Sequence, residues 1–375
     1  MKQIAIVSQG RSHLINLARC LDKYDDLEVT FYTMMPKSRC KQFGYHGRVV
    51  SCLFPTGIAS IIIEKIPFLN PYQRSELRIK LRIFFDKWMA FRLRKCDYLI
   101  GLNGTSVELS KKAKQKYGAL TICDQGSSHI LTQDSVRKSY SNSVPPYKNT
   151  EYMLKHYECV DYLMAPSYYV KETDIINGIE EDRILYNPYG VNTVLFRPTS
   201  KPSSDAYDVI MVGSWWKHKG CELLIEACIN VLGLKVLHVG TVIDCHLPNS
   251  PNFRHVDFVP ESELPQLYAQ AKIFVMPSLD EGFGLVLLQA VSCGLPIVGS
   301  SRTGVSDIAS LLADSNNCIT IDEPLSVDTI INAVKKALEA YESLPPGERL
   351  QFSDKLCNIT WEAYGARYYN ILKSI

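Results

Sequence analysis

The sequence of 375 residues lacks the features that mark several specialised classes of protein. It has no stretch that approaches the ~18 consecutive apolar residues of a membrane span, no internal repeat and no low-complexity tract. Its 41 basic and 39 acidic residues leave a formal net charge of only +2, which argues against a protein-wide field for nucleic acid. We therefore expect no nucleic-acid partner, and any charged ligand must be bound by a local patch.

The 12 cysteines also lack a pattern, because they are scattered singly without a C-x-x-C pair or a paired spacing of cysteine and histidine. Such cysteines predict reduced, mostly buried thiols in a cytoplasmic protein. A clear D-x-D motif for a metal ion is missing too. The first residues hold only a short apolar run, 4–7, which predicts a first strand rather than a signal peptide.

Short apolar segments alternate with amphipathic ones along the whole chain, which predicts an α/β fold with parallel sheets. Residues 187–205 are rich in Pro, Ser and Asn and have no periodicity, so they predict a linker. We expect two Rossmann-like doubly wound domains, 1–186 and 206–355, facing each other across a deep cleft where ligands bind, and a helix in 356–375 that packs back toward the first domain. The expected strands are 4–9, 29–34, 98–102, 120–123, 162–167, 208–214, 235–240, 253–259, 272–277, 296–301 and 318–321.

The stretch DEGFGLVLLQA, residues 280–290, follows an expected strand and opens an apolar helix. The free amides of 283–285 at the start of that helix would favour a phosphate or diphosphate. Eight residues of helix advance ~12 Å, so Glu281 and Gln289 could contact separate groups of one extended ligand. An ordinary loop-to-helix turn with two convenient glycines would also account for this stretch.

A second stretch, VGSWWKHKGCELLIEA at 212–227, repeats the order of strand, polar loop and helix. Lys219 lies at the expected helix start with Lys217 nearby, and a lysine there adds positive charge to an anion site. Solvated lysines at helix ends are common, and this is the plain alternative. Two such helix starts in one domain suggest a ligand with more than one phosphate.

Together these segments carry a family resemblance. The motifs SLDEGFGLVLLQAVSCGLPIVGSSRTGVSDI, GSWWKHKG, NPYGVNTVLFRP and DYLMAPSYYV resemble those of the retaining glycosyltransferases of family 4, which have the GT-B fold. The resemblance implies a nucleotide-diphosphate sugar as donor substrate, with no cofactor and no metal ion. It also implies that Lys219 binds the diphosphate, that Glu281 contacts the donor sugar and that Gln289 lies at the ribose. The residues expected to bind the donor are Gly10, Ser214, Lys217, Lys219, Glu281, Gly282, Phe283, Gly284, Leu285 and Gln289.

The chain departs from the family pattern at two of these positions. Ser214 stands where the family often has an arginine, so phosphate stabilisation would fall more heavily on Lys219, supplemented by Lys217 or His218. Gln289 replaces the second acid of a glutamate pair. A glutamine keeps an acceptor oxygen for a ribose hydroxyl but loses the charge, so binding should be weakened or altered.

In the first half, TICDQGSSHI again places a polar loop after an expected strand. The family supplies a histidine from this side of the cleft, and His129 is our candidate, with Asp124 as a possible neighbour. Such a lone histidine is more often structural. The first turn holds Gly10 near donor and acceptor, with Arg11 and His13 as weaker candidates, although an ordinary strand-to-helix turn would also explain it.

Residues 71–95 combine an apolar stripe with an excess of positive charge. A basic amphipathic helix can lie on an anionic membrane, which suits a transferase with a lipid-linked acceptor at the inner face of the cytoplasmic membrane. The alternative is an ordinary domain helix whose stripe packs on the sheet. The stripe is Leu77, Leu81, Phe84, Phe85 and Trp88, and the positive charges are Arg74, Arg78, Arg82, Arg92, Arg94 and Lys95.

The resemblance implies a metal-independent hexosyltransferase that acts with retention on a hydroxyl of a glycan or lipid-linked acceptor. Surface polysaccharide, lipopolysaccharide or glycolipid biosynthesis is the expected context, with Glu281, His129 and Lys219 as catalytic residues. Two alternatives stay open. The chain could be a GT-B-like epimerase or phosphorylase, or a non-catalytic nucleotide-sugar-binding protein in which Ser214 and Gln289 mark decay.

Overall fold

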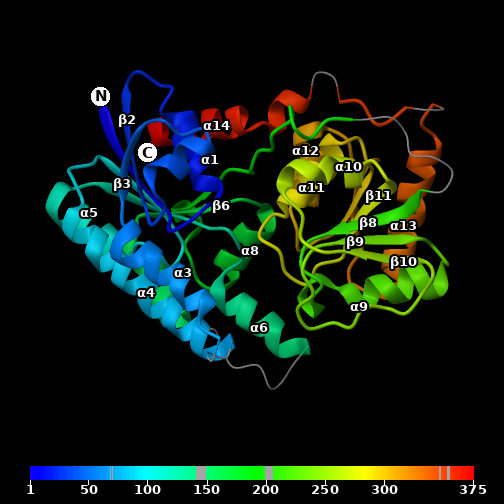
Figure 1. Cartoon of the computed structure of the whole chain (residues 1–375). Coiled ribbons are helices and arrows are strands. Elements are labelled where there is room, and N and C mark those ends of the chain that lie inside the picture. Colours follow the sequence, from blue (N-terminus) through cyan, green and yellow to red (C-terminus); the bar gives the residue numbers. More distant parts are fainter. Residues whose placement is uncertain (68, 70, 141–148, 199–205, 346–347, 353–354) are drawn as a thin grey trace.

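The chain forms two α/β units, each with one sheet between layers of helices, and the two units lie side by side (Figure 1). This computed structural model describes residues 1–67, 69, 71–140, 149–198, 206–345, 348–352 and 355–375. The expected α/β fold with two doubly wound domains is confirmed.

The N-terminal sheet is parallel throughout, in the order β3-β2-β1-β4-β5-β6-β7. The sequence pattern predicts five of these strands and misses the edge strands β3 and β7, because four and three residues are too few to show a period. The strands are β1 (Lys2–Val7), β2 (Leu27–Thr33), β3 (Arg48–Ser51), β4 (Tyr98–Leu102), β5 (Leu120–Asp124), β6 (Tyr162–Ala165) and β7 (Ile184–Tyr186).

Helices cover both faces of this sheet, and alternate residues of β1 show it. Ile4 and Ile6 belong to one apolar cluster, whereas Ala5 and Val7 belong to another. A strand buried on both faces is typical of a parallel sheet. The helices are α1 (His13–Leu21), α2 (Lys37–Gln42), α3 (Ile58–Lys65), α4 (Pro71–Arg92), α5 (Val107–Tyr117), α6 (Ile130–Tyr140), α7 (Thr150–Cys159) and α8 (Tyr168–Ile176), with the short turns η1 (Leu53–Gly57) and η2 (Glu181–Arg183).

The C-terminal sheet is also parallel, in the order β10-β9-β8-β11-β12-β13, and the sequence predicts each of these strands. The strands are β8 (Tyr207–Val212), β9 (Val236–Val239), β10 (Phe253–Val256), β11 (Ala271–Met276), β12 (Ile297–Ser300) and β13 (Cys318–Ile321). The helices and short turns are η3 (Lys217–Lys219), α9 (Cys221–Leu224), η4 (Ile225–Val231), η5 (Glu261–Glu263), α10 (Leu264–Tyr268), α11 (Leu285–Ser292), α12 (Val305–Leu312), α13 (Val327–Glu342), η6 (Leu356–Ile359) and α14 (Trp361–Ser374).

The last helix, α14, returns to the N-terminal unit and lies against α1 (Figure 1). Gly365 allows this close packing, because a Cβ atom there would overlap the side chain of Cys20. The Tyr98 hydroxyl donates to the carbonyl of Leu372 at 2.9 Å. The chain therefore crosses between the units twice, and the Val191 amide joins the two crossings by donating to the carbonyl of Ile359 at 2.8 Å.

Helix α4 ends at Arg92 rather than at residue 95, and its apolar stripe is divided between core and surface. Phe85 is fully buried, whereas Phe84 and Trp88 are exposed. The expectation of one undivided apolar face is therefore wrong, because Phe85 turns with Met89 into the core beside β1. The described helices include none that is both long and apolar enough to cross a membrane. All twelve cysteines are free thiols, and the expected burial is confirmed for ten of them.

Candidate active site

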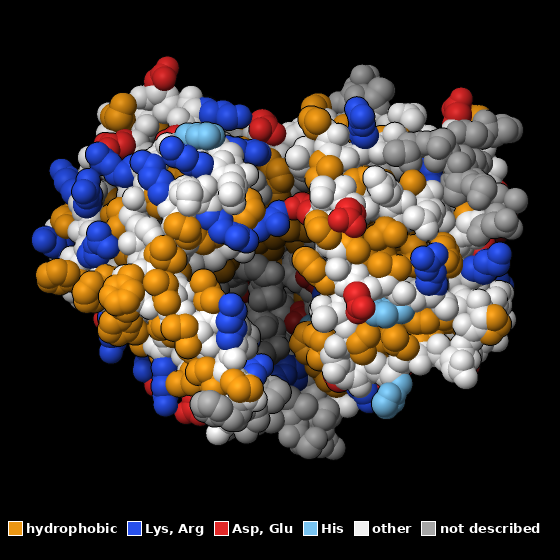
Figure 2. Space-filling model, in the orientation of Figure 1, with side chains coloured by type: hydrophobic (Ala, Val, Ile, Leu, Met, Phe, Trp, Pro, Cys, Tyr) orange, Lys and Arg blue, Asp and Glu red, His pale blue; other side chains and the backbone are white. Residues whose placement is uncertain are grey.

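A cavity of about 650 Å³ lies between the two domains. The N-terminal unit contributes the start of α1, including His13, and the C-terminal unit contributes Leu285, Val286 and Gln289 from α11. A smaller cavity of about 190 Å³ at the ends of β8 and β9 shares residues 258, 259 and 264 with it. Figure 2 shows the surface hollowed between the two units. A hollow between the domains is thus present where the sequence predicts a cleft.

The loop after β11 and the turn η3 place two predicted residues in direct contact. Lys219 Nζ forms an ion pair with Glu281 Oε2, and both side chains are about one-fifth exposed. Burial lowers the pKa of Lys219 to about 8, and the nearby carboxylate of Asp280 opposes this effect. Lys219 is therefore a cation whose charge is lost not far above neutral pH.

The backbone around α11 presents free donors beside this pair. Gly284, with a φ of 82°, turns the chain into α11. Within the described part of the chain, no hydrogen bond joins the amides of 283–285 to an acceptor. Phe283 is buried and its carbonyl accepts from the amide of Gly304 at 2.8 Å, so the loop is fixed while its amides stay available for an anion.

Gln289 and Ser214 lie in the two adjoining cavities rather than beside the ion pair. The Tyr268 hydroxyl donates to Gln289 Oε1 at 3.2 Å. The oxygen expected to serve a ribose hydroxyl is therefore already used once. The amide nitrogen of Gln289 has no partner among the described residues and can act as a donor.

Three predicted residues lie away from the ion pair of Lys219 and Glu281. Lys217 pairs with Glu222 at 3.3 Å on the outer side of η3. Gly10 is not among the residues lining the cavity, and its carbonyl accepts from the Ser8 hydroxyl at 3.0 Å.

His129 is the third predicted residue that lies away from the ion pair of Lys219 and Glu281. It is 1% exposed and stacks on Tyr157, with 4.6 Å between the ring centroids. Its Nδ1 accepts from the amide of Leu131 at 3.3 Å. Burial lowers the pKa of His129 to about 4, so the ring is neutral. These contacts all lie inside the N-terminal unit. We expected the ring of His129 to lie at the cleft. In the structure the ring is instead buried against Tyr157, behind the loop that follows β5.

A different histidine faces the cavity from this side. His13 Nε2 lies 2.6 Å from Asp124 Oδ1, and both side chains are buried. The ring of His13 packs on Tyr189 at 4.3 Å, and Tyr189 in turn meets Phe283 edge-on at 5.5 Å. The sequence assigned Asp124 to His129, and missed that the ends of β1 and β5 bring it to His13.

The domains touch directly next to Glu281. The Ser167 hydroxyl donates to the carbonyl of Gly282 at 2.6 Å. A Cβ atom at Gly282 would overlap the carbonyl oxygen of Gly126 and lie 2.7 Å from Cα of Ser127. Only glycine permits this approach.

Other contacts hold the same interface. Asp280 Oδ1 accepts from the Tyr169 hydroxyl at 2.8 Å, and Arg11 forms an ion pair with Glu261 beside the cavity. Among the described residues, no group of three or more His, Cys, Asp or Glu side chains is arranged to hold a metal ion.

Comparison with known proteins identifies the class of fold. Residues 206–340 match the family model described as glycosyl transferases group 1. The chain is 48% identical over 67 residues to O-antigen chain mannosyltransferase B of Escherichia coli, covering 17% of this chain and 18% of that protein. It is 24% identical over 205 residues to the phosphatidylinositol N-acetylglucosaminyltransferase GPI3 subunit of Saccharomyces cerevisiae, covering 49% and 44%. The chain thus spans about half or less of the length of these curated relatives.

Among solved structures, the chain resembles Anabaena Alr3699/HepE in complex with UDP and glucose, with a TM-score of 0.67 and 13% identity over the whole of both chains. The GT-B fold and the resemblance to GT-B glycosyltransferases are confirmed.

The contact at Gly282 can be tested by adding one methyl group. Gly282→Ala should lower the free energy of unfolding by about 1–3 kcal/mol, because the backbone of Gly126 cannot move aside without separating the domains. Thermal and urea unfolding would measure it. Gly126→Ala is the matched control, since a Cβ there meets nothing within 4 Å, and it should stay within about 0.5 kcal/mol of the parent protein. Equal stability of both variants would contradict this account of the interface.

Proposed function

We propose that the protein is a retaining glycosyltransferase that moves a hexose from a nucleotide-diphosphate sugar to a hydroxyl of a glycan or lipid-linked acceptor. The observation that carries the proposal is the ion pair of Lys219 and Glu281 beside the free amides of 283–285. The relatives named as an O-antigen mannosyltransferase and a phosphatidylinositol N-acetylglucosaminyltransferase component support a role in lipopolysaccharide, surface polysaccharide or glycolipid biosynthesis.

The donor diphosphate would bind the amides of 283–285 and draw Lys219 away from Glu281. The freed carboxylate then accepts hydrogen bonds from hydroxyls of the donor sugar. The acceptor oxygen forms a bond to the anomeric carbon while the bond from that carbon to the phosphate oxygen breaks. The diphosphate leaves with the electron pair and takes the acceptor proton. Lys219 and the amides stabilise its growing charge, so the step requires neither a cofactor nor a metal ion.

From the N-terminal side, we assign the contact with the donor to His13 in place of His129. Asp124 fixes the ring of His13, and the ring lines the cavity opposite α11. A buried carboxylate that holds a histidine in one orientation is typical of positioned polar groups at reaction sites.

The two alternatives differ from the proposal in their products. An epimerase interconverts the nucleotide sugar alone, and a phosphorylase uses free phosphate in place of an acceptor. A non-catalytic protein binds the nucleotide sugar and releases no nucleotide. Incubation with a panel of nucleotide-diphosphate sugars, followed by analysis of released nucleotide and sugar, separates these outcomes and identifies the donor.

Replacing Glu281 tests the donor-sugar contact. Glu281→Gln should lower kcat at least about 100-fold, since a neutral amide cannot replace a charged acceptor in the transition state. Steady-state kinetics and calorimetry with the nucleoside diphosphate would measure turnover and binding separately. Glu263→Gln is the control, because Glu263 is exposed and lies in the same domain. Near-normal turnover by Glu281→Gln would show that the residue has been assigned the wrong role.

The pKa of Lys219 predicts how donor binding depends on pH. This pKa of about 8 lies below the ordinary lysine value, so the positive charge is present below pH 8 and is lost above it. Affinity for a nucleoside diphosphate should therefore fall toward about tenfold per pH unit above that point. Lys219→Arg keeps its charge and should remove the dependence. Calorimetry between pH 7 and pH 10 measures both proteins, and parallel curves would refute the assignment.

We also propose that an anionic membrane is the surface on which the enzyme meets its acceptor. An apolar α3–α4 face is made of the side chains at 54, 61, 62 and 91, which are 53% to 83% exposed. Phe91 of this face lines a hollow with lysines 87, 111, 112 and 116 and with Glu108. Figure 2 shows apolar and basic side chains gathered over this part of the N-terminal unit. Apolar side chains flanked by cations fit the boundary between lipid headgroups and acyl chains.

Membrane binding can be tested with two equally exposed side chains. Phe91 is 83% exposed on the α3–α4 face, and Ile176 is 81% exposed at the end of α8. Phe91→Asp should weaken binding to vesicles with anionic lipid by about tenfold or more, because insertion of one aromatic side chain contributes ~1.5–3 kcal/mol. Ile176→Asp should bind like the parent protein. Vesicle sedimentation measures the difference, and equal binding by the two variants would exclude this face.

A further inference from the structure

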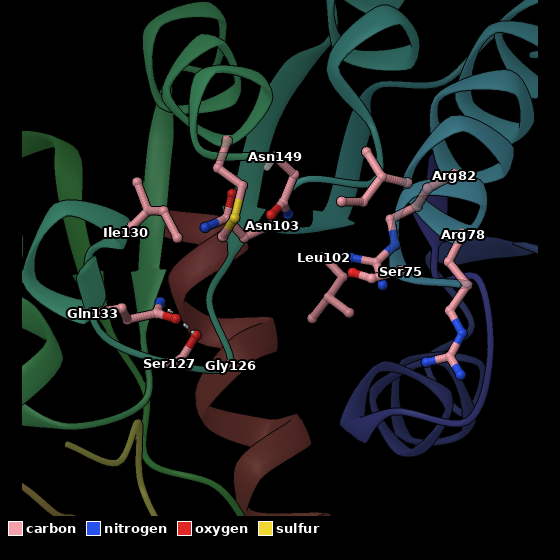
Figure 3. Close-up of a pocket in the computed structure, with 12 residues that line it drawn as sticks. Ser75, Arg78, Arg82, Leu102, Asn103, Gly126, Ser127, Ile130, Gln133 and Asn149 are labelled. Carbon is pink, nitrogen blue, oxygen red and sulfur yellow. Dashed lines mark hydrogen bonds between the residues drawn. The ribbon is translucent and has the colours of Figure 1, made fainter. Parts of the chain in front are cut away.

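A second large cavity lies wholly within the N-terminal unit. It has a volume of about 440 Å³ and lies between α4, the loop after β4, the loop after β5 and the start of α7 (Figure 3). Neither Glu281 nor Lys219 lines it. Its function is therefore not explained by the donor site.

One wall of this cavity is positively charged. Arg78 and Arg82 lie four residues apart on α4 and so share a face of the helix. Figure 3 shows the side chain of Arg82 reaching toward Leu102 across the cavity. The lining residues in the described part of the chain include no Asp or Glu. Two guanidinium groups on one wall of a cavity are typical of an anion site.

The surroundings of Arg82 strengthen this interpretation. Arg82 is half-buried, and within the described part of the chain it forms no hydrogen bond or ion pair. Burial and the neighbouring charge of Arg78 both lower the pKa of Arg82. A half-buried cation beside a like charge is unfavourable, and a bound anion would offset that cost.

The opposite wall offers neutral polar groups. Asn103 Nδ2 donates to the Tyr157 hydroxyl oxygen at 2.6 Å, and Asn103 Oδ1 is buried without a partner among the described residues. Gln133 donates to the Ser127 hydroxyl oxygen at 3.0 Å, which leaves the Ser127 proton free to donate. Figure 3 places these side chains across the cavity from Arg82. An unsatisfied buried amide oxygen is uncommon in folded proteins, and as an acceptor it fits a hydroxyl of the group that carries the phosphate rather than a phosphate oxygen.

We propose that this cavity binds a phosphate group of the acceptor, held by Arg78 and Arg82 on one side and by Ser127 on the other, with Asn103 Oδ1 accepting from a hydroxyl of the group that carries the phosphate. The inference rests on the proposed function and adds a class of acceptor, namely a phosphate monoester or diphosphate of a sugar or lipid. Its position suits transfer. Ser127 is next to the contact with Gly282, so an anchored acceptor has its sugar close to the loop that carries Glu281.

Chemical modification of individual arginines tests the site in the intact protein. Phenylglyoxal modifies guanidinium groups, and mass spectrometry of peptides gives the rate for each one. Inorganic phosphate should slow modification of Arg78 and Arg82 about fivefold or more, because a bidentate phosphate contact shields their nitrogens. Arg92, exposed at the end of the same helix, should react at an unchanged rate. Protection no greater than that of Arg92 would overturn the proposal.

Matched variants distinguish the source of the phosphate. Arg82→Gln should lose most of the affinity for glycerol phosphate if the natural acceptor is soluble, or for phosphatidic acid in phosphatidylcholine vesicles if it is a lipid. Lys80→Gln removes the same charge from α4 at a residue that does not line the cavity, and should retain both affinities. Equal loss by the two variants, or no loss by either, would contradict a specific site.

Failure of this inference can be told apart from failure of the proposed function. Slow hydrolysis of a nucleotide-diphosphate sugar involves the donor site alone, so Arg82→Gln should hydrolyse the donor at the parent rate. If the parent protein neither binds nor hydrolyses any such donor, the transferase proposal fails. The protection of Arg78 and Arg82 by phosphate would still decide the cavity by itself.

Discussion

The close approach of Gly282 to the loop of Gly126 and Ser127 is the contact on which the arrangement of both cavities depends. It joins the C-terminal loop that carries Glu281 to the N-terminal loop that lines the cavity of Arg82. A side chain at 282 would separate these loops by the thickness of a methyl group. Because transfer requires an acceptor hydroxyl close to the donor sugar, the absence of a side chain at this position is a constraint on chemistry as well as on packing.

The charges around the cleft are held by partners from distant parts of the chain. Asp124 is fully buried against His13, and Asp307 accepts from the Tyr168 amide and the Tyr186 hydroxyl at 2.9 Å and 2.7 Å. Burial raises the pKa of Asp307, so these neutral donors are what stabilise its ionised form. Fixed groups of this kind reorganise little when charge develops nearby. Lys219 and Glu281 differ, since each serves as the other's partner and both must exchange it for a ligand.

The alternation of strand and helix was enough to predict two parallel sheets, because long central strands carry their own signal. The short edge strands β3 and β7 carry almost none, and their place depends on pairing with β2 and β6. The contact between Lys219 and Glu281 could be predicted, because the motifs that contain them lie in two loops that follow the carboxyl ends of strands in one sheet. The histidine at the cavity could not be predicted in this way. His129 directly follows a polar loop in sequence, yet His13 reaches the cavity, because the strand order β1-β4-β5 brings the start of α1 to Asp124. The order of the strands in the sheet cannot be deduced from how close two residues are in the sequence.

At Gln289, the hydrogen bonds in the structure change how the replacement of the family's second glutamate by glutamine is interpreted. Its oxygen accepts from Tyr268 and keeps one lone pair, so a ribose hydroxyl can either donate to this oxygen or accept from the NH2. A hydrogen bond with a neutral amide is also about half as strong as a charge-assisted hydrogen bond. Ser214 supplies no cation at the neighbouring cavity, and Lys219 is neutralised by Glu281 before a ligand arrives. Under the proposed function, donor affinity in this chain would therefore depend on the backbone amides of 283–285 as well as on the charge of Lys219, once a ligand separates that lysine from Glu281. Amide contacts of this kind are less weakened by salt than contacts between full charges.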